Sequence, residues 1–548
     1  MRKKKEVKKP MAVWYQGEKK RCVIDSPKVV DFLNYMEFGI YKDEIIRRDE
    51  NSVLDIYSKE DISRFLFEYY MDFDEKEYDN PKTLGVVKSK IPITSPDGEY
   101  IGEDIQYFSK DEVRKSLMKF GWYQDTLKIY LNQFNDDKLK VKGEDLHTPI
   151  FKDNRDTVYT FFDSGVVKTS KTKSELISYD EVEDGYIWKS SIRPQLKKIE
   201  IDNSSKGMFE KFVELSMSVK NDKGEWNVDE KEYENFRTVY GYMLSNYNNG
   251  GQTNSPVFVD RDTDGKHAEG GNGKSLVMGS VEQWKKTLPI NGKNISQQDK
   301  FLFSGVQSDT EFIFLDDVGE DFNFKVIYNY TTSDMEIEKK FKDRIVIDKN
   351  SKPKIGIATN YILDDTDFST KRRQYIVEFG SFWHDKLKEE GIEVMDYFNG
   401  KRLFDDFDEM EWNNFFNYGF RCVQEYLLKG VVGNPNSSYK RKQIISKIEG
   451  KGVNDGVVDW MTNWIEENEL NLREGLPIND LFVEFDNSFD IDISDKWDFT
   501  RLKKGLFELC DEKKWNFNPH KVGKTYSQKR WLKGPKNEQK EWIKIHLK

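Results

Sequence analysis

The chain has 548 residues, of which 34% are charged and 37% hydrophobic, and its formal net charge is −11. This length exceeds what one hydrophobic core supports, so we expect several domains of ~100–200 residues each. The negative charge argues against a protein that coats nucleic acid with its whole surface. No apolar run approaches the ~18 residues of a membrane span, and the basic residues 1–9 lack the apolar stretch of a signal peptide, which predicts a cytoplasmic protein without a membrane partner.

The three cysteines, Cys22, Cys422 and Cys510, lie far apart and form no C-x-x-C pair. This spacing excludes a thiolate zinc site and a disulfide framework, and it fits a reducing compartment.

Residues 1–200 are predicted to form an α+β region with no assigned role. Helices are expected over 58–71, where Ser58 caps the start, and over 109–134, with strands over 157–162 and 185–189. The acids of this region are scattered, whereas a metal-dependent nucleotidyl transferase needs clustered carboxylates for two cations. Residues 205–250 carry apolar side chains at three- and four-residue intervals, which predicts a continuous helical collar.

A glycine-rich stretch follows a predicted strand at 256–260 and opens a helix expected over 274–284. It contains Gly270, Gly271, Asn272, Gly273, Lys274 and Ser275, and it matches G-x-x-x-x-G-K-[ST] except that Ala268 replaces the first glycine. The glycines let backbone amides approach an anion, Lys274 reaches the β- and γ-phosphates, and the Ser275 hydroxyl binds Mg²⁺. Alone, the stretch fits equally a plain glycine-rich turn before a helix.

Two further buried strands end in polar residues. The apolar run 312–315 is followed by Asp316 and Asp317, at the strand end where an α/β sheet binds ligands. Asp316 would hold the Mg²⁺, and Asp317 would orient or deprotonate the attacking water. The strand over 352–358 leads to Asn360, whose amide can bond the water and a γ-phosphate oxygen.

Two basic segments complete the set. Arg372 and Arg373 precede a strand, and either one is a candidate arginine finger for a neighbouring subunit; alone, the pair is a surface charge cluster. The alternating run 334–347 predicts a β-hairpin whose tip would bind the phosphates of one DNA strand in a ring channel; the alternative is a solvent-facing hairpin. Its cations are Lys339, Lys340, Lys342 and Arg344.

With these motifs in this order, residues 250–385 resemble the superfamily 3 helicases of viruses, phages and mobile elements. More loosely, the whole chain resembles phage replication helicases often described as primase-like. The resemblance implies a multidomain α/β protein with an AAA+-like P-loop core that uses ATP and Mg²⁺. It also implies a homo-hexameric ring with shared nucleotide sites, 3′→5′ movement on single-stranded DNA, and work on forked DNA with replication proteins in the cytoplasm of a bacterial host.

The domains expected are a helicase ATPase domain over 251–430 with a helical lid at 404–428, a linker over 431–445, and a winged-helix-like domain over 446–548. Residues 501–548 hold 14 Lys and Arg against five Asp and Glu. Helices are predicted near 455–467, 477–487 and 498–513, followed by a hairpin over 515–531. The third helix would enter a DNA groove, and the hairpin would form a wing; a protein-docking winged helix has the same pattern. The candidate contacts are Arg501, Lys503 and Lys504 in the helix and Lys521, Lys524, Lys529 and Arg530 in the wing.

The leading hypothesis is an ATP-dependent DNA helicase for phage or mobile-element replication. One alternative is a non-unwinding P-loop ATPase that assembles on an origin or loads another protein, which has no need of a basic hairpin in a channel. The other is a bifunctional primase–helicase, disfavoured because no carboxylate cluster is present.

Overall fold

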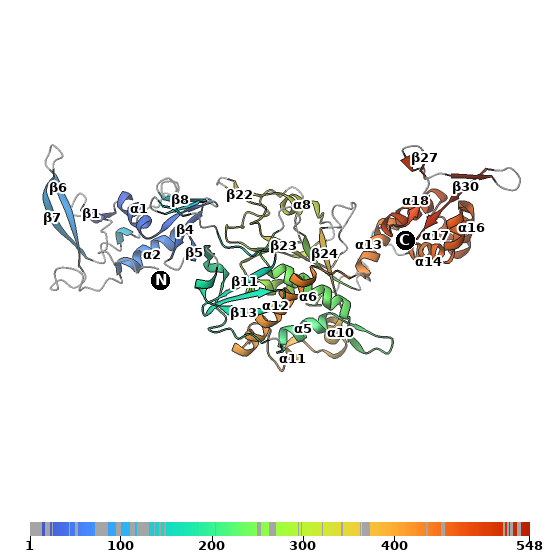
Figure 1. The fold of residues 1–548 in the computed structure, drawn as a ribbon, viewed down its shortest axis with the longest axis horizontal. Coiled ribbons are helices and arrows are strands. Elements are labelled where there is room, and N and C mark those ends of the chain that lie inside the picture. Colours follow the sequence, from blue (N-terminus) through green and yellow to red (C-terminus); the bar gives the residue numbers. More distant parts are fainter. Residues whose placement is uncertain are drawn as a thin grey trace.

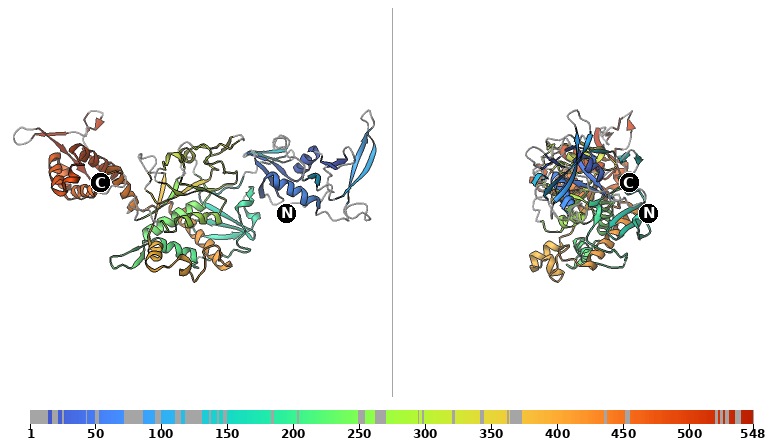
Figure 2. Two further views of the ribbon diagram at one scale, coloured as in Figure 1. Left: turned by 180° about the vertical axis from the view of Figure 1, so that it is seen from behind. Right: turned by 90° about the vertical axis from the view of Figure 1, so that its left-hand side faces the viewer.

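The structure is a computed structural model of the chain. Three parts follow one another along its long axis: an N-terminal region, a central body and a C-terminal helical domain (Figures 1 and 2). The residues that the structure describes are 14–16, 22–24, 26–42, 44–49, 53–71, 86–94, 100–109, 115–117, 131–135, 138–141, 144–146, 150–182, 185–202, 204–248, 254–261, 270–293, 295–296, 299–319, 322–340, 344–361, 363, 373–434, 437–450, 455–518, 521–522, 525–526, 530–533 and 539–547.

The N-terminal region is built on a seven-stranded mixed sheet with two helices against it. The helices α1 (Ser26–Tyr35) and α2 (Lys59–Met71) bury Phe32, Leu33, Ile62 and Leu66 in one core. The predicted cap of α2 is confirmed, because the Asp61 amide donates to the Ser58 hydroxyl at 3.1 Å and Asp61 accepts from the Ser58 amide at 2.9 Å. The sheet runs, in order, β10 (Glu144–Leu146), β9 (Lys138–Val141), β8 (Asn132–Asn135), β3 (Phe38–Tyr41), β4 (Glu44–Arg48), β5 (Val53–Tyr57) and β14 (Ile187–Trp188).

Two separate antiparallel ladders accompany this sheet. The longer one, β6 (Val86–Thr94) with β7 (Tyr100–Ser109), extends away at the N-terminal end of the molecule (Figure 1). The shorter one joins β1 (Trp14–Gln16) to β2 (Cys22–Ile24).

The central body contains a five-stranded sheet in which every neighbouring pair is parallel. Its order is β19 (Thr287–Asn291), β20 (Phe312–Val318), β23 (Lys354–Thr359), β18 (Ser255–Asp260) and β24 (Gln374–Phe379). The three strands predicted at 256–260, 312–315 and 352–358 are confirmed, and both β18 and β23 are buried along their whole length. Apolar runs of this kind fit a parallel sheet covered on both faces.

A helical layer shares one hydrophobic core with this sheet. It consists of α5 (Met208–Ser216), α6 (Glu230–Leu244) and α12 (Glu409–Lys429), whose Phe212, Phe236 and Phe416 pack in the same cluster as Phe258 of β18. The expectation of a continuous helix over 205–250 is wrong. A hairpin of β16 (Ser218–Lys220) and β17 (Trp226–Val228) separates α5 from α6, and its turn uses Gly224 at a φ of 79°.

A four-stranded sheet packs on the other side of α12. Its strands are β13 (Ser174–Ile177), β12 (Gly165–Ser170), β11 (Thr157–Phe162) and β15 (Ile192–Arg193). Phe162 of β11 meets Phe416 of α12 edge to face, with ring centroids 4.9 Å apart. The strands β11, β12, β13 and β15 therefore pack with the central body, whereas β14, which lies between β13 and β15 in the chain, pairs with β5 in the N-terminal sheet.

The C-terminal domain has its own core around Trp497, Met461 and Leu506. The three predicted helices are present as α14 (Val457–Glu467), α16 (Ile478–Ser488) and α18 (Phe499–Glu512), with α15 (Glu469–Glu474) and α17 (Ile491–Ser494) between them. A small three-stranded sheet has the strand order β25 (Leu476–Pro477), β30 (Gln539–Ile543) and β29 (Arg530–Lys533). A short hairpin of β27 (Lys521–Val522) with β28 (Thr525–Tyr526) lies within the expected span 515–531, and a further antiparallel ladder, which was not predicted, joins β29 to β30.

One helix, α13 (Ser438–Ile448), joins the central body to the C-terminal domain (Figure 1). Shorter elements complete the described chain. They are α7 (Lys274–Gly279), α8 (Lys325–Thr332), α10 (Phe382–Glu390), α11 (Val394–Tyr397), the hairpin of β21 (Met335–Ile337) and β22 (Ile345–Ile347), and the pair β26 (Asn516–Phe517) and β31 (Ile545–His546). Among the described residues, no helix is both long and apolar enough to cross a bilayer.

Candidate nucleotide-binding site

The order of the central strands gathers the predicted residues at one edge. Because the strands are parallel, the carboxyl ends of β18, β20 and β23 lie together, and these are the ends that carry the glycine-rich loop, the acid pair and Asn360. Since β23 lies between the other two, Asn360 stands between the loop and the acids. A Cβ built on Gly270 would lie 3.6 Å from Asn360 Nδ2.

The glycine-rich loop adopts backbone angles that require glycine. Gly271 and Gly273 have φ values of 93° and 92°, in the left-handed region. A side chain on Gly273 is also excluded by space, because its Cβ would come within 2.5 Å of Phe212 Cζ of α5. The predicted helix from Lys274 is α7, followed by a 3-10 turn over Ser280–Gln283. Ala268 lies outside the described residues.

Lys274 is buried at the start of α7 and forms an ion pair with Asp260, the last residue of β18. The Asn272 side-chain amide donates to the same carboxylate, with Nδ2 2.9 Å from Asp260 Oδ1. Burial lowers the pKa of Lys274, and the neighbouring Asp260 opposes that effect. Sequence reasoning missed Asp260, although an acid at the carboxyl end of the strand before the loop was visible in the sequence.

Ser275 and Asp316 lie in direct contact although 41 positions separate them in the chain. The Ser275 hydroxyl donates to Asp316 Oδ1 at 2.6 Å. The two oxygens are of the type that hard divalent cations prefer. Among the described residues, no group of three or more His, Cys, Asp or Glu side chains is placed to hold a metal ion. A cation at this edge would therefore complete its shell with water and ligand oxygens, as Mg²⁺ usually does.

Asp317 lies within a break in the pairing of β20 with β23. The register shifts between Leu315 and Val318, and Asp317 takes a φ of 53° that few non-glycine residues adopt. Thr359 Oγ1 donates to the Val318 carbonyl at 2.7 Å, which ties the end of β20 to the end of β23. The Asp317 carboxylate is partly exposed and pairs with Lys293, with Nζ 2.9 Å from Oδ2. Lys293 is a second residue that the sequence did not single out.

Arg373 is not brought together with these residues. It directly precedes β24, and its carbonyl accepts from the Ser255 amide at the start of β18, at 2.8 Å. Arg373 therefore lies at the amino edge of the sheet, whereas the loop leaves the carboxyl edge. The six residues of β18 separate the amino edge from the carboxyl edge, a distance of about 20 Å at ~3.3 Å per residue. Arg372 lies outside the described residues.

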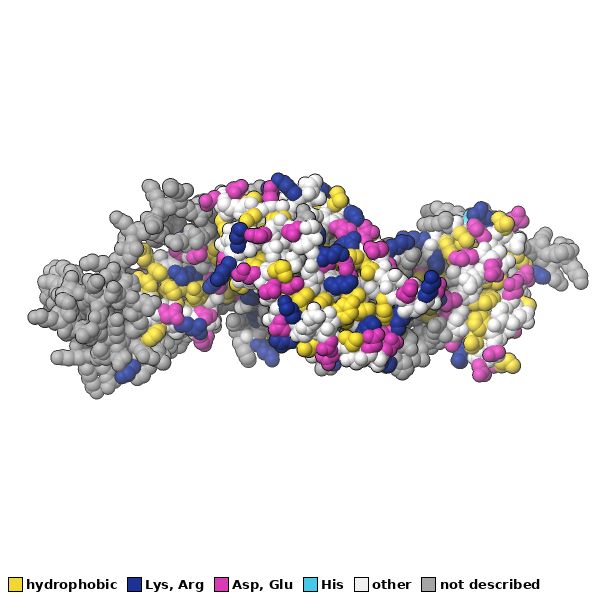
Figure 3. All heavy atoms as spheres, turned by 90° about the horizontal axis from the view of Figure 1, so that it is seen from below, with side chains coloured by type: hydrophobic (Ala, Val, Ile, Leu, Met, Phe, Trp, Pro, Cys, Tyr) yellow, Lys and Arg dark blue, Asp and Glu magenta, His cyan; other side chains and the backbone are white. Residues whose placement is uncertain are grey.

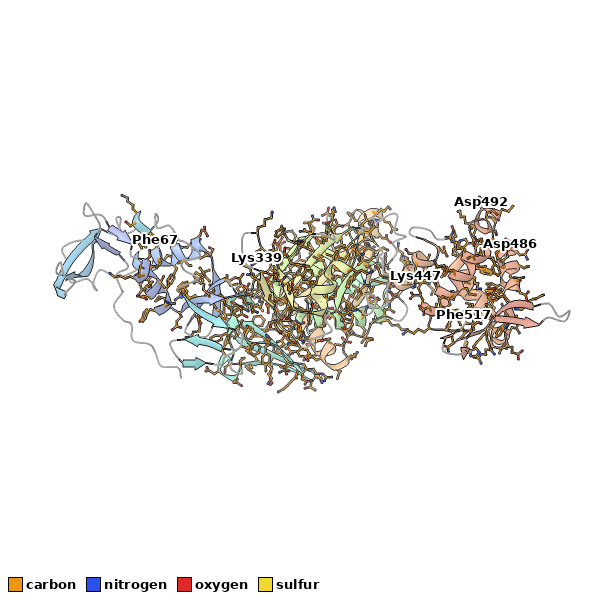
Figure 4. All side chains as sticks on the ribbon, turned by 90° about the horizontal axis from the view of Figure 1, so that it is seen from above. Phe67, Lys339, Lys447, Asp486, Asp492 and Phe517 are labelled. Carbon is orange, nitrogen blue, oxygen red and sulfur yellow. The ribbon has the colours of Figure 1, made fainter. Side chains whose placement is uncertain are left out.

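The predicted basic hairpin is confirmed as β21 paired with β22, but its cations have partners. Lys339, labelled in Figure 4, is almost buried. Its Nζ lies 3.5 Å from Glu44 Oε1 of β4 in the N-terminal region. Lys340 Nζ lies 5.6 Å from the ring centre of Phe301, and Arg344 forms a 2.6 Å ion pair with Glu336. Lys342 lies outside the described residues.

The candidate groove residues of α18 are likewise engaged within their own domain. Arg501 donates to the carbonyls of Lys496 and Glu449, both at 2.9 Å, and Lys503 pairs with Glu541. Lys504 extends into solvent beside Glu508, at 3.8 Å. Of the proposed wing residues, Lys524 and Lys529 lie outside the described residues. On the face seen in Figure 3, acidic and basic side chains are intermixed over the central body.

No protein-family model matches the chain, and no curated protein matches it. Among solved structures, the chain is similar to the C-terminal region of NrS-1 in its apo form. The identity is 11% over 71% of this chain and 96% of the other, with TM-scores of 0.26 and 0.31 in two structures. It is also similar to JCV helicase, at 13% identity over 37% of this chain and 67% of the other, with a TM-score of 0.19.

Proposed function

We propose that the chain is an ATP-dependent DNA helicase of a phage or mobile element. The observation that carries the proposal is the contact between Ser275 and Asp316 beside the buried Lys274, at the edge of the parallel sheet where the glycine-rich loop ends. A phosphate cradle, a cation-binding oxygen pair and a polar strand end are thus assembled from three separate strands.

In this proposal the donor set fits an ATP–Mg²⁺ complex. Mg²⁺ held by Ser275 and Asp316 would neutralise charge that develops on the phosphates. Lys274 binds the β- and γ-phosphate oxygens, and the loop amides of Gly270–Gly273 surround them. Asp317 accepts a proton from the attacking water or orients it, and Asn360 donates to a γ-phosphate oxygen.

Movement on DNA requires residues outside this edge. Arg372 or Arg373 would complete the site of a neighbouring subunit in a homo-hexamer, and the hairpin cations Lys339, Lys340, Lys342 and Arg344 would bind the phosphates of single-stranded DNA. Lys504 and the basic C-terminal strands would contact forked DNA or replication proteins in the cytoplasm of a bacterial host.

The test is strand displacement on a forked DNA substrate with ATP and Mg²⁺. The Lys274→Ala variant is expected to lose unwinding and ATP hydrolysis, because it removes the cation that binds the phosphates. The control is Lys198→Ala, which removes an exposed lysine paired only with Glu200. If the intact protein hydrolyses ATP and separates no strands, the helicase proposal is wrong.

A second candidate is a non-unwinding ATPase that loads another protein or assembles on an origin. It is favoured by one observation, the burial of Lys339 against Glu44 instead of its presentation to DNA. Charge reversal of Lys339 and Lys340 separates the two candidates: a helicase loses unwinding and retains basal ATP hydrolysis, whereas a loader retains its activity. A primase activity in addition is tested by template-dependent oligonucleotide synthesis.

A further inference from the structure

The helix α13 belongs to two hydrophobic cores at once. Tyr439, in its first turn, is fully buried in the cluster that contains Val257 of β18 and Leu315 of β20. Ile445 and Ile448, at its other end, are buried in the core of the C-terminal domain. Residues 431–445 were expected to be a linker, and the structure instead fixes their second half as a helix.

The start of α13 is anchored on a buried carboxylate of the central sheet. Glu378 of β24 accepts from the amides of Ser438 and Tyr439, both at 3.2 Å, and it also accepts from the Ser437 hydroxyl. A carboxylate at a helix N-terminus satisfies amides that lack a partner within the helix and complements the helix dipole. A second buried acid, Glu232, accepts from the Glu378 amide at 2.9 Å and from Asn434 Nδ2 at 2.6 Å.

The same turn reaches the start of the loop that leads to Gly270. Lys442 Nζ donates to the carbonyl of Arg261 at 2.6 Å, and the Ser438 hydroxyl lies 3.0 Å from that carbonyl. The hydroxyl also lies 2.6 Å from Glu378 Oε2, so it donates to one of the two acceptors at a time. Arg261 is the first residue after β18, and its guanidinium is held by Asp229 at 2.6 Å.

A third contact reaches the segment behind Asn360. The Tyr439 hydroxyl accepts from the amide of Leu363 at 2.8 Å, and both residues are buried. Leu363 follows Asn360 by three positions. One turn of α13 therefore holds the backbone on both sides of the candidate site, at the start of the phosphate loop and just after the polar strand end.

We propose that Tyr439 and Lys442 are positioning residues for the nucleotide site, Tyr439 acting through Leu363 on Asn360. Lys442 acts through Arg261 on the neighbouring Asp260, which holds Asn272 and Lys274. This inference rests on the proposed function. Because α13 continues into the C-terminal core, the position of that domain and the geometry of the site are linked. The two contacts act on different parts of the nucleotide, so their loss has different kinetic effects.

The test measures kcat for ATP hydrolysis and the Kd values of ATP and ADP for two full-length variants. Tyr439→Phe leaves the buried Leu363 amide without its acceptor, and kcat is expected to fall about tenfold while the Kd of ADP stays within about twofold. Lys442→Met keeps the aliphatic stem, and it is expected to weaken ADP and ATP alike by about threefold to tenfold, with kcat at saturation retained. The control is Tyr179→Phe, which removes a hydroxyl that donates to the Phe162 carbonyl far from the site.

Wild-type values of kcat and Kd in both variants would overturn the inference and leave the proposed function intact. Parallel losses of kcat and affinity with a lowered Tm in both variants would also overturn it, since they indicate a merely structural role. If the intact protein does not hydrolyse ATP, both the inference and the proposed function fail.

Discussion

At the scale of single residues, Asp260 is the acid that opposes the effect of burial on the pKa of Lys274. The pKa of Lys274 is lowered by burial and raised by Asp260, so removal of the carboxylate lowers it further. Asp260→Asn retains an acceptor for Asn272 and is expected to bind ATP progressively more weakly than the wild type as the pH rises from 7 to 9. Calorimetric titration across this range measures the ratio of the two affinities. A ratio that stays constant with pH would contradict the role of Asp260 in raising the pKa of Lys274.

Asp153 gives a second prediction, on stability. Burial raises its pKa to about 6 from 3.8, while amides of Tyr159 and Asn246 donate to it at 2.9 and 2.7 Å. The folded-state pKa lies above the unfolded value, so the folded state binds the proton more tightly. Stability is therefore lost as the pH rises from 3.8 to about 6. Between pH 5 and 7.5, the free energy of unfolding of the wild type relative to Asp153→Asn should fall by about 1.4 kcal/mol. Urea denaturation at the two pH values measures this difference, and a pH-independent difference would refute it.

The residues that local spacing identifies were the ones that the sequence could predict. Lys274, Ser275 and Asp316 lie in short motifs, and the structure brings them together. The role of Lys293 depends on which strand ends become neighbours, a property of the folded sheet, whereas Asp260 directly precedes the loop and was overlooked. The partner of Lys339 could not be predicted from local spacing, because Glu44 lies in a different region of the chain.

At the scale of elements, the hairpin of β21 and β22 is held by the N-terminal region. Glu44 pairs with Lys339 and also accepts from the Ser308 amide at 2.9 Å. Glu44→Gln removes the competing charge, so single-stranded DNA is expected to bind more tightly, with a salt dependence steeper by about 0.7 in the slope of log K against log salt concentration. Fluorescence anisotropy over a salt series measures this slope.

The matched control for this prediction is Asp55→Asn. Asp55 lies on β5 of the same sheet and pairs with Lys189 at 2.8 Å, away from the hairpin. An unchanged slope for Glu44→Gln would show that Lys339 does not contact DNA.

Elements were predictable where periodicity and capping agree, as in α2 and α18, which begin at the capping residues Ser58 and Asp498. The predicted helix over 205–250 failed because the polar run 220–225, which contains Asn221 and Gly224, forms a turn between two short strands. The Asn221 amide donates to the Glu225 carbonyl at 2.9 Å and closes the hairpin there. The ladder of β29 with β30 was not predicted, because the partner of Arg530–Lys533 lies farther along the chain at Gln539–Ile543 and no local pattern marks that pairing.

At the scale of the whole molecule, the position of Arg373 predicts a site shared between subunits. It lies about 20 Å along the strands from the phosphate loop, at ~3.3 Å per residue, so it cannot serve the loop of its own chain. Lys274→Ala and Arg373→Ala are each expected to be inactive alone. When the two are co-expressed, ATP hydrolysis should return, because some interfaces combine an intact loop with an intact arginine.

The same co-expression with Arg372→Ala identifies which arginine is the finger. Absence of hydrolysis in the mixed assemblies of both pairs would contradict a shared site. The order of the strands that places Arg373 at the amino edge could not be predicted from the sequence, because it follows from packing and not from any local pattern.

The residues that pack against the phosphate loop determine how far the protein can be truncated. Gly273 rests on Phe212 of α5, whose ring stacks on Trp383 of α10 with centroids 4.9 Å apart, and the loop start is held by Lys442 of α13. Parts that serve one small site are thus spread from α5 to α13, well outside the stretch between the first and last sequence motifs. A truncated protein cut at residues 250 and 385 would expose apolar surface and lack the supports of its loop. The smallest fragment worth expressing begins before Thr157, so that it keeps the sheet packed on α12, and includes the C-terminal domain, whose core contains Ile445 and Ile448 of α13.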